Sequence, residues 1–423
     1  MSEAIETLII GAGQAGLSLS YHLTQRGMPH LVLEQAERLA NPWRNQRWDS
    51  FTLVTPNWLI NLPGGEYQGA EPDGFMPRDE VVSYLEGYAA SFRAPVCFGQ
   101  QVTAVARHNS HYLVQTTQGD YRAANVVIAT GIFQKPHIPA YRASLPGGLN
   151  QLHTGEYRNP AKLPPGAVLV VGSAQSGCQI AEELYQSGRK VYLSVGASSG
   201  RVPRKYRGQE ILRWLVQTGF FEQTFEQAPP PKNKFAGNPQ ISGKDGGHTL
   251  NVHKFARQGV TLLGRMTGAQ GDRLSFAPDL RESLEKIDLF EDFVVSKINE
   301  FIAARQIQAP GESLLKFTDG YKAEIITELD IEKCGITSLI WGMGYKFDFS
   351  WVHLPVFDSA GFPLQADGIT TSAGLYFLGL PWQRARKSGG FYGIGEDAAT
   401  IADHLVERSP HEFPSPQRMK SND

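Results

Sequence analysis

The chain has 423 residues, more than one hydrophobic core usually supports, so we expect two domains or one domain with a large insert. Forty lysine and arginine residues against 42 aspartate and glutamate residues leave a net charge of -2 without a long basic run, which argues against nucleic-acid binding. The three cysteines, Cys97, Cys178 and Cys334, lie far apart without a CxxC pair, which disfavours a disulfide scaffold, a zinc site and a dithiol redox centre.

A glycine-rich turn lies near the start of the chain, between a predicted buried strand at residues 7–10 and a predicted helix at residues 17–25. Its sequence GAGQAG places Gly11, Gly13 and Gly16 in the GxGxxG spacing of a dinucleotide-binding turn. The first glycine makes the turn, the second lets the backbone approach a pyrophosphate, and the third permits close packing of helix on strand. Free N–H groups at the start of the helix then favour the phosphates.

An acidic residue follows the next predicted strand, residues 30–33. Glu34 stands about 20 residues beyond the turn, where a carboxylate accepts hydrogen bonds from an unmodified ribose and repels a 2′-phosphate. The first turn is therefore predicted to bind FAD or NAD and not NADP. The expected contacts of this fold, assigned to FAD, are Gly11, Gly13, Gln14, Ala15, Gly16, Glu34 and Gln35.

The same order of strand, turn and helix recurs further along the chain. A predicted strand at residues 168–171 precedes GSAQSG, in which Ala174 replaces the middle glycine. The next predicted strand, residues 190–195, ends without a carboxylate, and basic residues follow it: Arg201, Arg204, Lys205 and Arg207. These changes favour a 2′-phosphate, although solvated surface charges would give the same pattern. We expect NADPH here, held by Gly172, Ser173, Ala174, Gln175, Ser176, Gly177, Arg201 and Arg204.

The two turns indicate an α/β protein with two Rossmann-like dinucleotide-binding domains, the NADPH domain inserted into the FAD domain. A third predicted strand, residues 126–128, precedes a turn at Ala129, and Pro-rich residues 224–247 predict a surface loop before a helix at 279–305. The predicted division is 1–155 for the first part of the FAD domain, 156–345 for the NADPH domain with a helical and loop elaboration at 221–310, 346–408 for the second part of the FAD domain, and 409–423 for a flexible tail.

With these motifs the sequence resembles the class B flavin-dependent monooxygenases, the flavin-containing monooxygenase type that includes the YUCCA-like enzymes. Residues 41–44, Asn-Pro-Trp-Arg, are similar to the family's Gly-Gly-x-Trp-Arg without its two glycines, and residues 48–56 resemble the segment under the isoalloxazine. Animal-type members have an Asn directly after the Thr of that segment, whereas here Pro56 follows Thr55 and Asn57 comes one place later.

Further motifs resemble the places where the family's chain crosses between its domains. These are Ala129-Thr130-Gly131 and residues 341–345, in which Gly342-Met343-Gly344 replaces the usual Ala-Thr-Gly. Residues 153–157 match the tail of the family's FxGxxxHxxxY fingerprint, but its front half is absent. His153 is therefore either an organiser of the domain junction or an ordinary structural histidine.

The last motifs are a short strand at residues 374–379 and a helix that begins near Gly395. In the family this helix directs its N-terminus at the flavin pyrimidine edge. The basic segment 382–390 between them borders the expected flavin site and faces either an anionic substrate or solvent. The resemblance implies further FAD contacts from Trp43, Arg44, Leu53, Thr55, Val102, Ala129, Thr130, Gly131, Gly379 and Gly395, a further NADP contact from Gly344, and no catalytic side chain beyond the candidates His153 and Asn57.

The resemblance implies that NADPH reduces FAD, that the reduced flavin adds oxygen to give a peroxyflavin, and that a nitrogen, a sulfur or a carbonyl carbon then takes one oxygen atom. Two alternatives stay open: an NADPH-dependent flavin reductase, and a flavoprotein binding or redox-sensing module. The expected partners are O2 and a small-molecule substrate, with no metal, nucleic acid or membrane, and a homodimer stays open. No apolar stretch approaches the roughly 18 to 20 residues of a membrane helix, so we expect a cytoplasmic protein.

Overall fold

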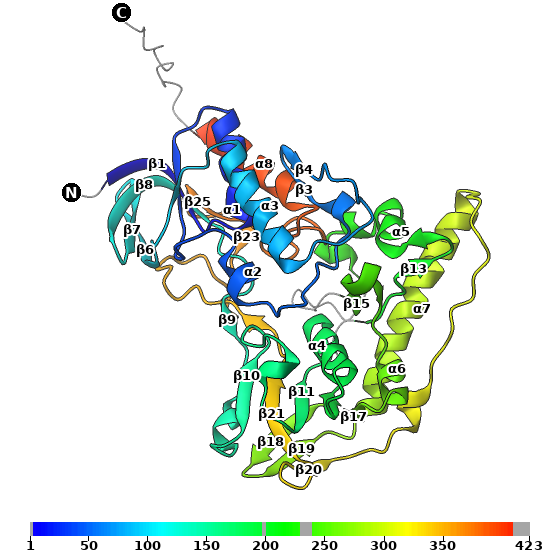
Figure 1. Cartoon of the computed structure of the whole chain (residues 1–423). Helices are drawn as coiled ribbons and strands as arrows, with labels where there is room; N and C mark the ends of the chain where they lie inside the picture. Colours follow the sequence, from blue (N-terminus) through cyan, green and yellow to red (C-terminus); the bar gives the residue numbers. More distant parts are fainter. Residues whose placement is uncertain (1–2, 197–199, 229–238, 409–423) are drawn as a thin grey trace, which may run out of the picture.

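The computed structural model describes residues 3–196, 200–228 and 239–408, and it contains one mixed and one parallel sheet with helices packed against them (Figure 1). The predicted tail, residues 409–423, lies outside the described residues, as does part of the predicted Pro-rich loop. Within the described ranges, no helix combines the length and the apolar character needed to cross a lipid bilayer.

The first sheet is built from both ends of the chain, in the order β23-β24-β25-β8-β1-β2-β5, with β6 and β7 joined to β8. The predicted strands at 7–10, 30–33 and 126–128 lie within it. Strand β25 pairs parallel to β8 although about 250 residues separate them in the chain. The strands are β1 (Glu3–Ile10), β2 (His30–Leu33), β5 (Val96–Cys97), β6 (Val102–His108), β7 (His111–Thr116), β8 (Gly119–Ile128), β23 (Gln365–Ala366), β24 (Ile369–Thr370) and β25 (Leu375–Phe377).

The second sheet lies in the chain between β8 and β25, so it is inserted into the first, as the sequence predicts. Its order is β10-β21-β11-β12-β17 and all its pairs are parallel. The strands are β10 (Asn150–His153), β11 (Ala167–Val171), β12 (Val191–Ser194), β17 (Thr261–Leu263) and β21 (Ile336–Trp341). Because β10 pairs with β21, this sheet begins before residue 156, where the sequence division starts the second domain.

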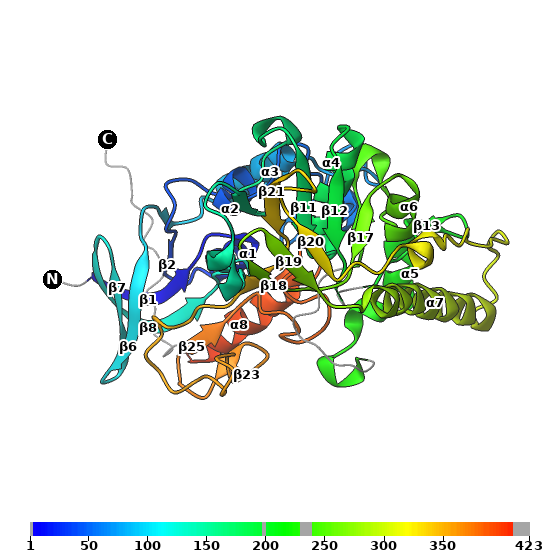
Figure 2. The same ribbon diagram turned by 90° about the horizontal axis from the view of Figure 1, so that it is seen from below.

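Helices pack their apolar faces on these sheets. Helices α1 and α8 lie side by side and share one core, to which Leu17, Ile401 and Leu405 belong. Helix α7 lies on the side of the second sheet away from β1 and β8 in both views (Figures 1 and 2). The helices are α1 (Gln14–Gln25), α2 (Asn41–Asn45), α3 (Arg78–Ser91), α4 (Gln175–Gln186), α5 (Ile211–Gln217), α6 (Val252–Arg257), α7 (Leu280–Ala304) and α8 (Ile394–Arg408).

Short strands in four pairs and one three-stranded sheet complete the described fold, and one pair joins the two crossings between the sheets. Tyr345 of the second crossing pairs with Pro136 of the first, so the connections are hydrogen-bonded to each other. The short strands are β3 (Asn61–Leu62), β4 (Gly65–Glu66), β9 (Lys135–Pro136), β13 (Lys205–Tyr206), β14 (Gln209–Glu210), β15 (Ile241–Ser242), β16 (His248–Thr249), β18 (Met266–Gln270), β19 (Arg273–Phe276), β20 (Glu328–Asp330) and β22 (Tyr345–Lys346).

Candidate functional site

The two glycine turns have the same backbone geometry. Each begins with a glycine at positive φ, +107° at Gly11 and +109° at Gly172. The N–H group of Gly11 donates to Leu33 O at 2.8 Å, and that of Gly172 donates to Ser194 O at 3.1 Å. Each first glycine is thereby tied to the last residue of the neighbouring parallel strand, and a side chain in this backbone conformation would be strained.

The third glycine of each turn is required by close packing. A Cβ atom on Gly16 would lie 1.9 Å from Gly11 O, and one on Gly177 would lie 1.9 Å from Gly172 O. No van der Waals contact is possible at that distance, so the helix approaches the turn only because these positions carry no side chain.

The middle position of each turn is open. A Cβ atom added to Gly13 would meet nothing within 4 Å. Gly13 and Ala174 have nearly the same backbone angles, φ -80° and ψ -175° against φ -68° and ψ -179°, so the methyl group of Ala174 fits without strain. Open space in front of the free N–H groups of a helix suits a pyrophosphate, so both turns fit a dinucleotide.

The two turns differ in the residue that follows the second strand. Glu34 accepts hydrogen bonds from Ala12 N and Ala36 N, both at 3.0 Å. Val195 takes the corresponding place after β12 and is fully buried. Glu34 N donates to the next strand at 2.9 Å and Val195 N donates likewise at 2.8 Å, which confirms the correspondence. A carboxylate is therefore present at the first turn and replaced by an apolar side chain at the second.

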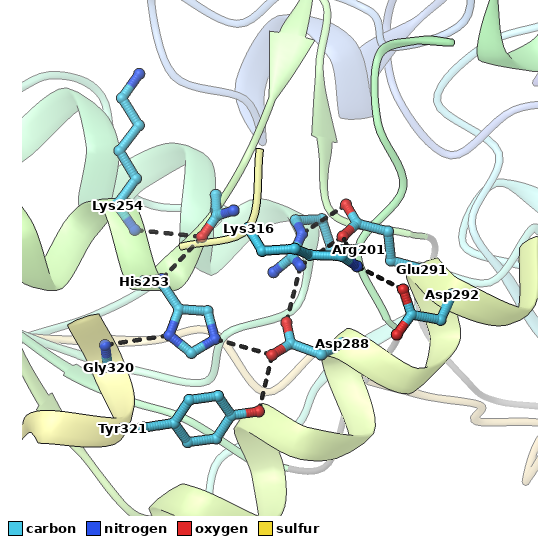
Figure 3. Close-up of polar contacts among 10 residues, drawn as sticks. Arg201, His253, Lys254, Asp288, Glu291, Asp292, Lys316, Gly320 and Tyr321 are labelled. Carbon is cyan, nitrogen blue, oxygen red and sulfur yellow. Dashed lines mark hydrogen bonds and ion pairs between the residues drawn. The ribbon is translucent and has the colours of Figure 1, made fainter. Parts of the chain in front are cut away.

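Arg201, a predicted contact of the NADPH phosphate, lies in a buried ion-pair cluster. Its side chain is 2% exposed, and its Nη2 atom lies 2.8 Å from Asp288 Oδ1 and 2.8 Å from Glu291 Oε2 on α7 (Figure 3). Tyr321 and His253 also donate to Asp288 Oδ2, at 2.7 and 3.2 Å. Burial alone would raise the pKa of Asp288, but these hydrogen bonds and the Arg201 charge lower it to about 2. The guanidinium is thus committed to α7, which counts against its predicted contact with a 2′-phosphate.

Arg204 is also committed to the protein. It is 4% exposed, its Nη1 donates to Val54 O at 2.9 Å, and its guanidinium lies 4.1 Å from the centre of the Phe75 ring. Its Nη2 lies 3.1 Å from Glu210. Desolvation lowers the pKa of Arg204 to about 10, so it stays charged at neutral pH. Arg204 joins the inserted domain to the first domain, and this placement too counts against its predicted phosphate contact.

The predicted flavin segment packs between the domains. Trp43 lies 6.1 Å from Phe391, measured between ring centres, and Arg44 pairs with Glu86 of α3. The N–H group of Leu53 donates to Met76 O at 2.8 Å. Beyond Glu34, a surface hollow of about 430 Å³ is lined by Gln35, Ala36, Glu37, Arg38, Asn41, Arg44, Asn45 and Gln101. The structure therefore places the predicted residues Gln35 and Arg44 together.

The two catalytic candidates, Asn57 and His153, are buried and hydrogen-bonded to nearby backbone groups. Asn57 is 4% exposed and donates from Nδ2 to Glu71 O at 2.9 Å. His153 is 1% exposed, its Nε2 lies 3.1 Å from Gly344 O, and its Nδ1 accepts from Gly155 N at 3.2 Å. A neutral ring with its proton on Nε2 satisfies both contacts, and burial lowers the pKa of His153. His153 therefore fastens the second crossing to β10.

The loop between β25 and α8 lies against the first turn. Gln14 Nε2 donates to Gly389 O at 3.2 Å, and Gly379 N donates to Gln383 Oε1 at 3.0 Å. At the start of α8, Gly395 O lies 3.2 Å from His22 Nε2. Gln14, Gly379 and Gly395, which the sequence assigns to one site, thus come together around the first turn.

The remaining predicted residues hold positions set by the backbone. Ala15 lies in the first turn of α1, and Gln175 and Ser176 lie in the first turn of α4. Val102 begins β6. After β8, Ala129 N donates to Ile10 O at 2.9 Å and Thr130 Oγ1 accepts from Gln134 at 3.0 Å. Thr55 lies partly buried in the segment after Leu53, and Gly131 has φ +70°.

Two functional candidates have no sequence signal. Gln240 is fully buried and donates from Nε2 to Ser173 O in the second turn at 2.6 Å, while its Oε1 has no hydrogen-bond partner among the described residues. Glu183 of α4 accepts from Ser50 Oγ and from Tyr157 OH, both at 2.6 Å, and so ties the second helix to the flavin segment. Neither residue belongs to a motif, because the partners of each come from distant parts of the chain.

The described residues provide neither a dithiol nor a metal centre. Cys178 is buried, its Sγ donates to Ser173 O at 3.1 Å, and burial raises the pKa of its thiol. Cys97 and Cys334 are free as well. Across the part of the chain that the structure describes, no group of three or more His, Cys, Asp or Glu side chains is placed to hold a metal ion.

Comparisons with known proteins give matches to oxidoreductases. A model of the pyridine nucleotide-disulphide oxidoreductase family matches residues 8–206. The chain is 33% identical to an uncharacterized CzcO-like oxidoreductase from Geobacillus kaustophilus, over 96% of this chain and 99% of that protein. It is 27% identical to a probable indole-3-pyruvate monooxygenase, YUCCA3 from Arabidopsis thaliana, over 98% of this chain and 89% of that protein.

Solved structures share the fold over almost the whole chain. A flavin-containing monooxygenase from Stenotrophomonas maltophilia matches with a TM-score of 0.62 and 18% identity, covering 96% of this chain and 99% of that one. The bacillithiol disulfide reductase Bdr from Bacillus cereus matches with a TM-score of 0.62 and 16% identity, covering 96% and 100%. The two neighbours have different activities, so this likeness establishes the fold and leaves the reaction to be argued from the site.

Proposed function

This chain belongs to the family of CzcO-like oxidoreductases, and from that premise we propose that it is an NADPH- and FAD-dependent monooxygenase that transfers one oxygen atom from O2 to a small organic substrate. The observation that carries the proposal is the pair of equivalent turns, one with the carboxylate of Glu34 and one with Val195 in its place. One chain thereby has a place for a resident flavin and a separate place for its reductant.

In this proposal the first turn holds FAD. The backbone of Gly11, Gly13 and Gly16 forms the pyrophosphate cradle, and Glu34 stands at the end of β2 for the ribose. The helix N-termini of α1 and α8 both lie at this site and favour negative charge. When bound, FAD supplies hydride acceptance and oxygen activation.

The second turn holds NADPH in this proposal. Gly172 and Gly177 form the cradle, and Gln240 supports it through the hydrogen bond to Ser173 O. The preference for NADPH over NADH rests on Val195, because no carboxylate there opposes a 2′-phosphate. Arg201 and Arg204 are left out of the proposed phosphate site because their guanidinium groups are held within the protein.

The side chains at the junction hold the two domains in a fixed relative position. Arg204 contacts Val54, Glu183 contacts Ser50 and Tyr157, and His153 is a neutral ring bonded at both nitrogens. His153 has no proton to give without losing one of these contacts. The proposed reaction therefore relies on the cofactor for its chemistry and on the protein for a closed, ordered site.

Isotope labelling tests the proposal. The holoenzyme is supplied with NADPH and ¹⁸O2 and a panel of amines, thioethers, ketones and 2-oxo acids, and NADPH consumption is compared with product mass. A monooxygenase gives at least one substrate that accelerates NADPH consumption and gains one ¹⁸O atom. Stoichiometric hydrogen peroxide without any labelled product, across the whole panel, would refute the proposal and favour the flavin reductase.

The reductase remains the second candidate because the fold is shared with a disulfide reductase. The cysteine geometry argues against a dithiol mechanism: the described structure leaves all three cysteines free, and Cys178 beside the second turn is buried with a raised thiol pKa. A reductase would have to pass electrons directly from the flavin to its acceptor.

A further inference from the structure

Arg386 lies in the loop between β25 and α8 with its guanidinium between two aromatic rings. The guanidinium carbon is 4.1 Å from the centre of the Phe220 ring and 4.5 Å from that of Trp382. The backbone N–H of Arg386 donates to Gln223 O at 2.9 Å, which fixes the loop against the segment after α5. The side chain is therefore held in place by packing and not by an ion pair.

No carboxylate within the described residues pairs with Arg386. Its Nη2 donates to the amide oxygen of Gln223 at 3.2 Å, and its Nε is buried without a hydrogen-bond partner in the described part of the chain. Burial lowers the pKa of Arg386 to about 10, so the group is charged at neutral pH. A charged, partly desolvated guanidinium with a free donor is costly unless a ligand completes it.

The acidic residues nearby are held by other cations. Lys387 Nζ lies 2.8 Å from Glu222 and 2.6 Å from Glu396, so both carboxylates are paired with that lysine. Arg384, two residues earlier, is exposed and donates to Thr400 at 2.9 Å. Arg386 is thus the cation of this loop that has no carboxylate partner among the described residues, and a bound anion could supply one.

The same loop is placed beside the proposed flavin site. Gly389, three residues after Arg386, accepts from Gln14 of the first turn at 3.2 Å. Trp382 has φ +55°, a strained value for a large side chain, and strain of this kind gathers at ligand sites. Its ring lies 5.7 Å from that of Phe225, which adds an apolar wall next to the cation.

We propose, on the basis of the function proposed above, that Arg386 binds the carboxylate of an organic-acid substrate, whose apolar or aromatic body lies against Trp382 and the neighbouring phenylalanines. A guanidinium bonds a carboxylate through its N–H donors. The Arg386 side chain is partly exposed, so a carboxylate can reach its open edge, whereas the enclosed Nε gains a partner only if the side chain shifts on binding. The inference narrows the substrate to anionic compounds with an apolar body, and neutral ketones and amines become poor ligands.

The test is a binding titration of the oxidised holoenzyme that requires no turnover. Phenylacetate, 3-phenylpropanoate and indole-3-acetate are each compared with the corresponding neutral amide, and binding is followed through the flavin absorption spectrum. The variants are Arg386→Gln and Arg386→Lys, with Arg384→Gln as the matched control because it removes a cation from the same loop at an exposed position. Flavin content and thermal midpoint show that each variant is folded.

We expect the wild type and Arg384→Gln to bind the carboxylates at least tenfold more tightly than the amides. Arg386→Gln should lose this preference, and Arg386→Lys should keep part of it because the charge remains. Equal binding of acids and amides by the wild type, or equal losses in Arg384→Gln and Arg386→Gln, would overturn the inference.

The outcome is separable from that of the proposed function. Loss of acid binding in Arg386→Gln without labelled product from any substrate would support the carboxylate site and reject the monooxygenase. Labelled product from neutral substrates, with acid binding unaffected by Arg386→Gln, would support the monooxygenase and reject the carboxylate site.

Discussion

Replacing Arg201 with glutamine distinguishes an arginine that holds the fold from one that binds a cofactor phosphate. Its guanidinium contacts Asp288 and Glu291 at 2.8 Å each, and the side chains of Arg201 and Glu291 are 2% and 7% exposed. Removing one partner of a buried ion pair costs about 3 to 5 kcal/mol, because the remaining charges lose their compensation. Lys316 still lies 3.1 Å from Glu291, so we expect the lower end, about 3 kcal/mol.

Thermal unfolding measures this cost. At roughly 2 to 4 °C per kcal/mol for a domain of this size, Arg201→Gln should lower the unfolding midpoint by about 6 to 12 °C. The ratio of kcat/KM for NADPH to that for NADH should stay within about twofold of the wild type. As a control, Arg265→Gln removes a largely exposed ion pair with Asp279 at 3.5 Å and should cost less than about 1 kcal/mol.

Acid titration adds a second readout. The pKa of Asp288 is lowered to about 2, so its contribution to the free energy of unfolding is present above pH 4 and is lost as the pH falls toward 2. Arg201→Gln should reduce this acid-dependent part. A tenfold fall in the preference for NADPH, together with an unchanged unfolding midpoint, would refute the reasoning and return Arg201 to the phosphate site.

The remaining predictions concern the first turn and two titrating groups. Gly13→Val should give folded protein with little bound flavin, measured as the ratio of visible to ultraviolet absorbance. Gly16→Ala should lose about 3 kcal/mol of stability in urea, because its Cβ would lie 1.9 Å from a carbonyl oxygen. Full flavin content in Gly13→Val, or unchanged stability in Gly16→Ala, would contradict the packing described for the first turn. Burial raises the pKa of Asp397 to about 6, so the stability of the fold should fall as the pH rises from 4 to 6. Asp397→Asn should recover up to about 3 kcal/mol at pH 7 and nothing at pH 3.5. An equal gain at both pH values would show that the titration of Asp397 is not the cause. The hydrogen bond to Glu182 raises the pKa of His248, so this pair should stabilise the fold below pH 6.5 and lose its effect as the pH rises through the raised pKa. His248→Gln should therefore make the free energy of unfolding less pH-dependent in that range. An unchanged pH profile would refute this role of the pair.

Local patterns predict the turns and strands because their causes are local. The spacing of Gly11 and Gly16 follows from one helix packing on one strand, and the sequence shows it directly. The ion pairs of Arg201 could not be predicted because its partners lie 87 and 90 residues away, and the sequence does not distinguish a basic residue that pairs with α7 from one that binds a phosphate. Gln240, within the predicted Pro-rich loop, carries no signal at all, since its contact with the second turn joins residues 67 apart in the chain.

The single methyl group at Ala174 bears on how long each nucleotide stays. Gly13 leaves its turn bare, so a diphosphate can come into direct contact with the backbone, whereas the methyl group at Ala174 holds a diphosphate slightly further out. Weaker binding of the diphosphate suits a co-substrate that must leave after every catalytic cycle, and tighter binding suits a prosthetic group that remains through many cycles. With the two cofactors bound as proposed, this one-carbon difference between otherwise equivalent turns favours release of NADPH and retention of FAD.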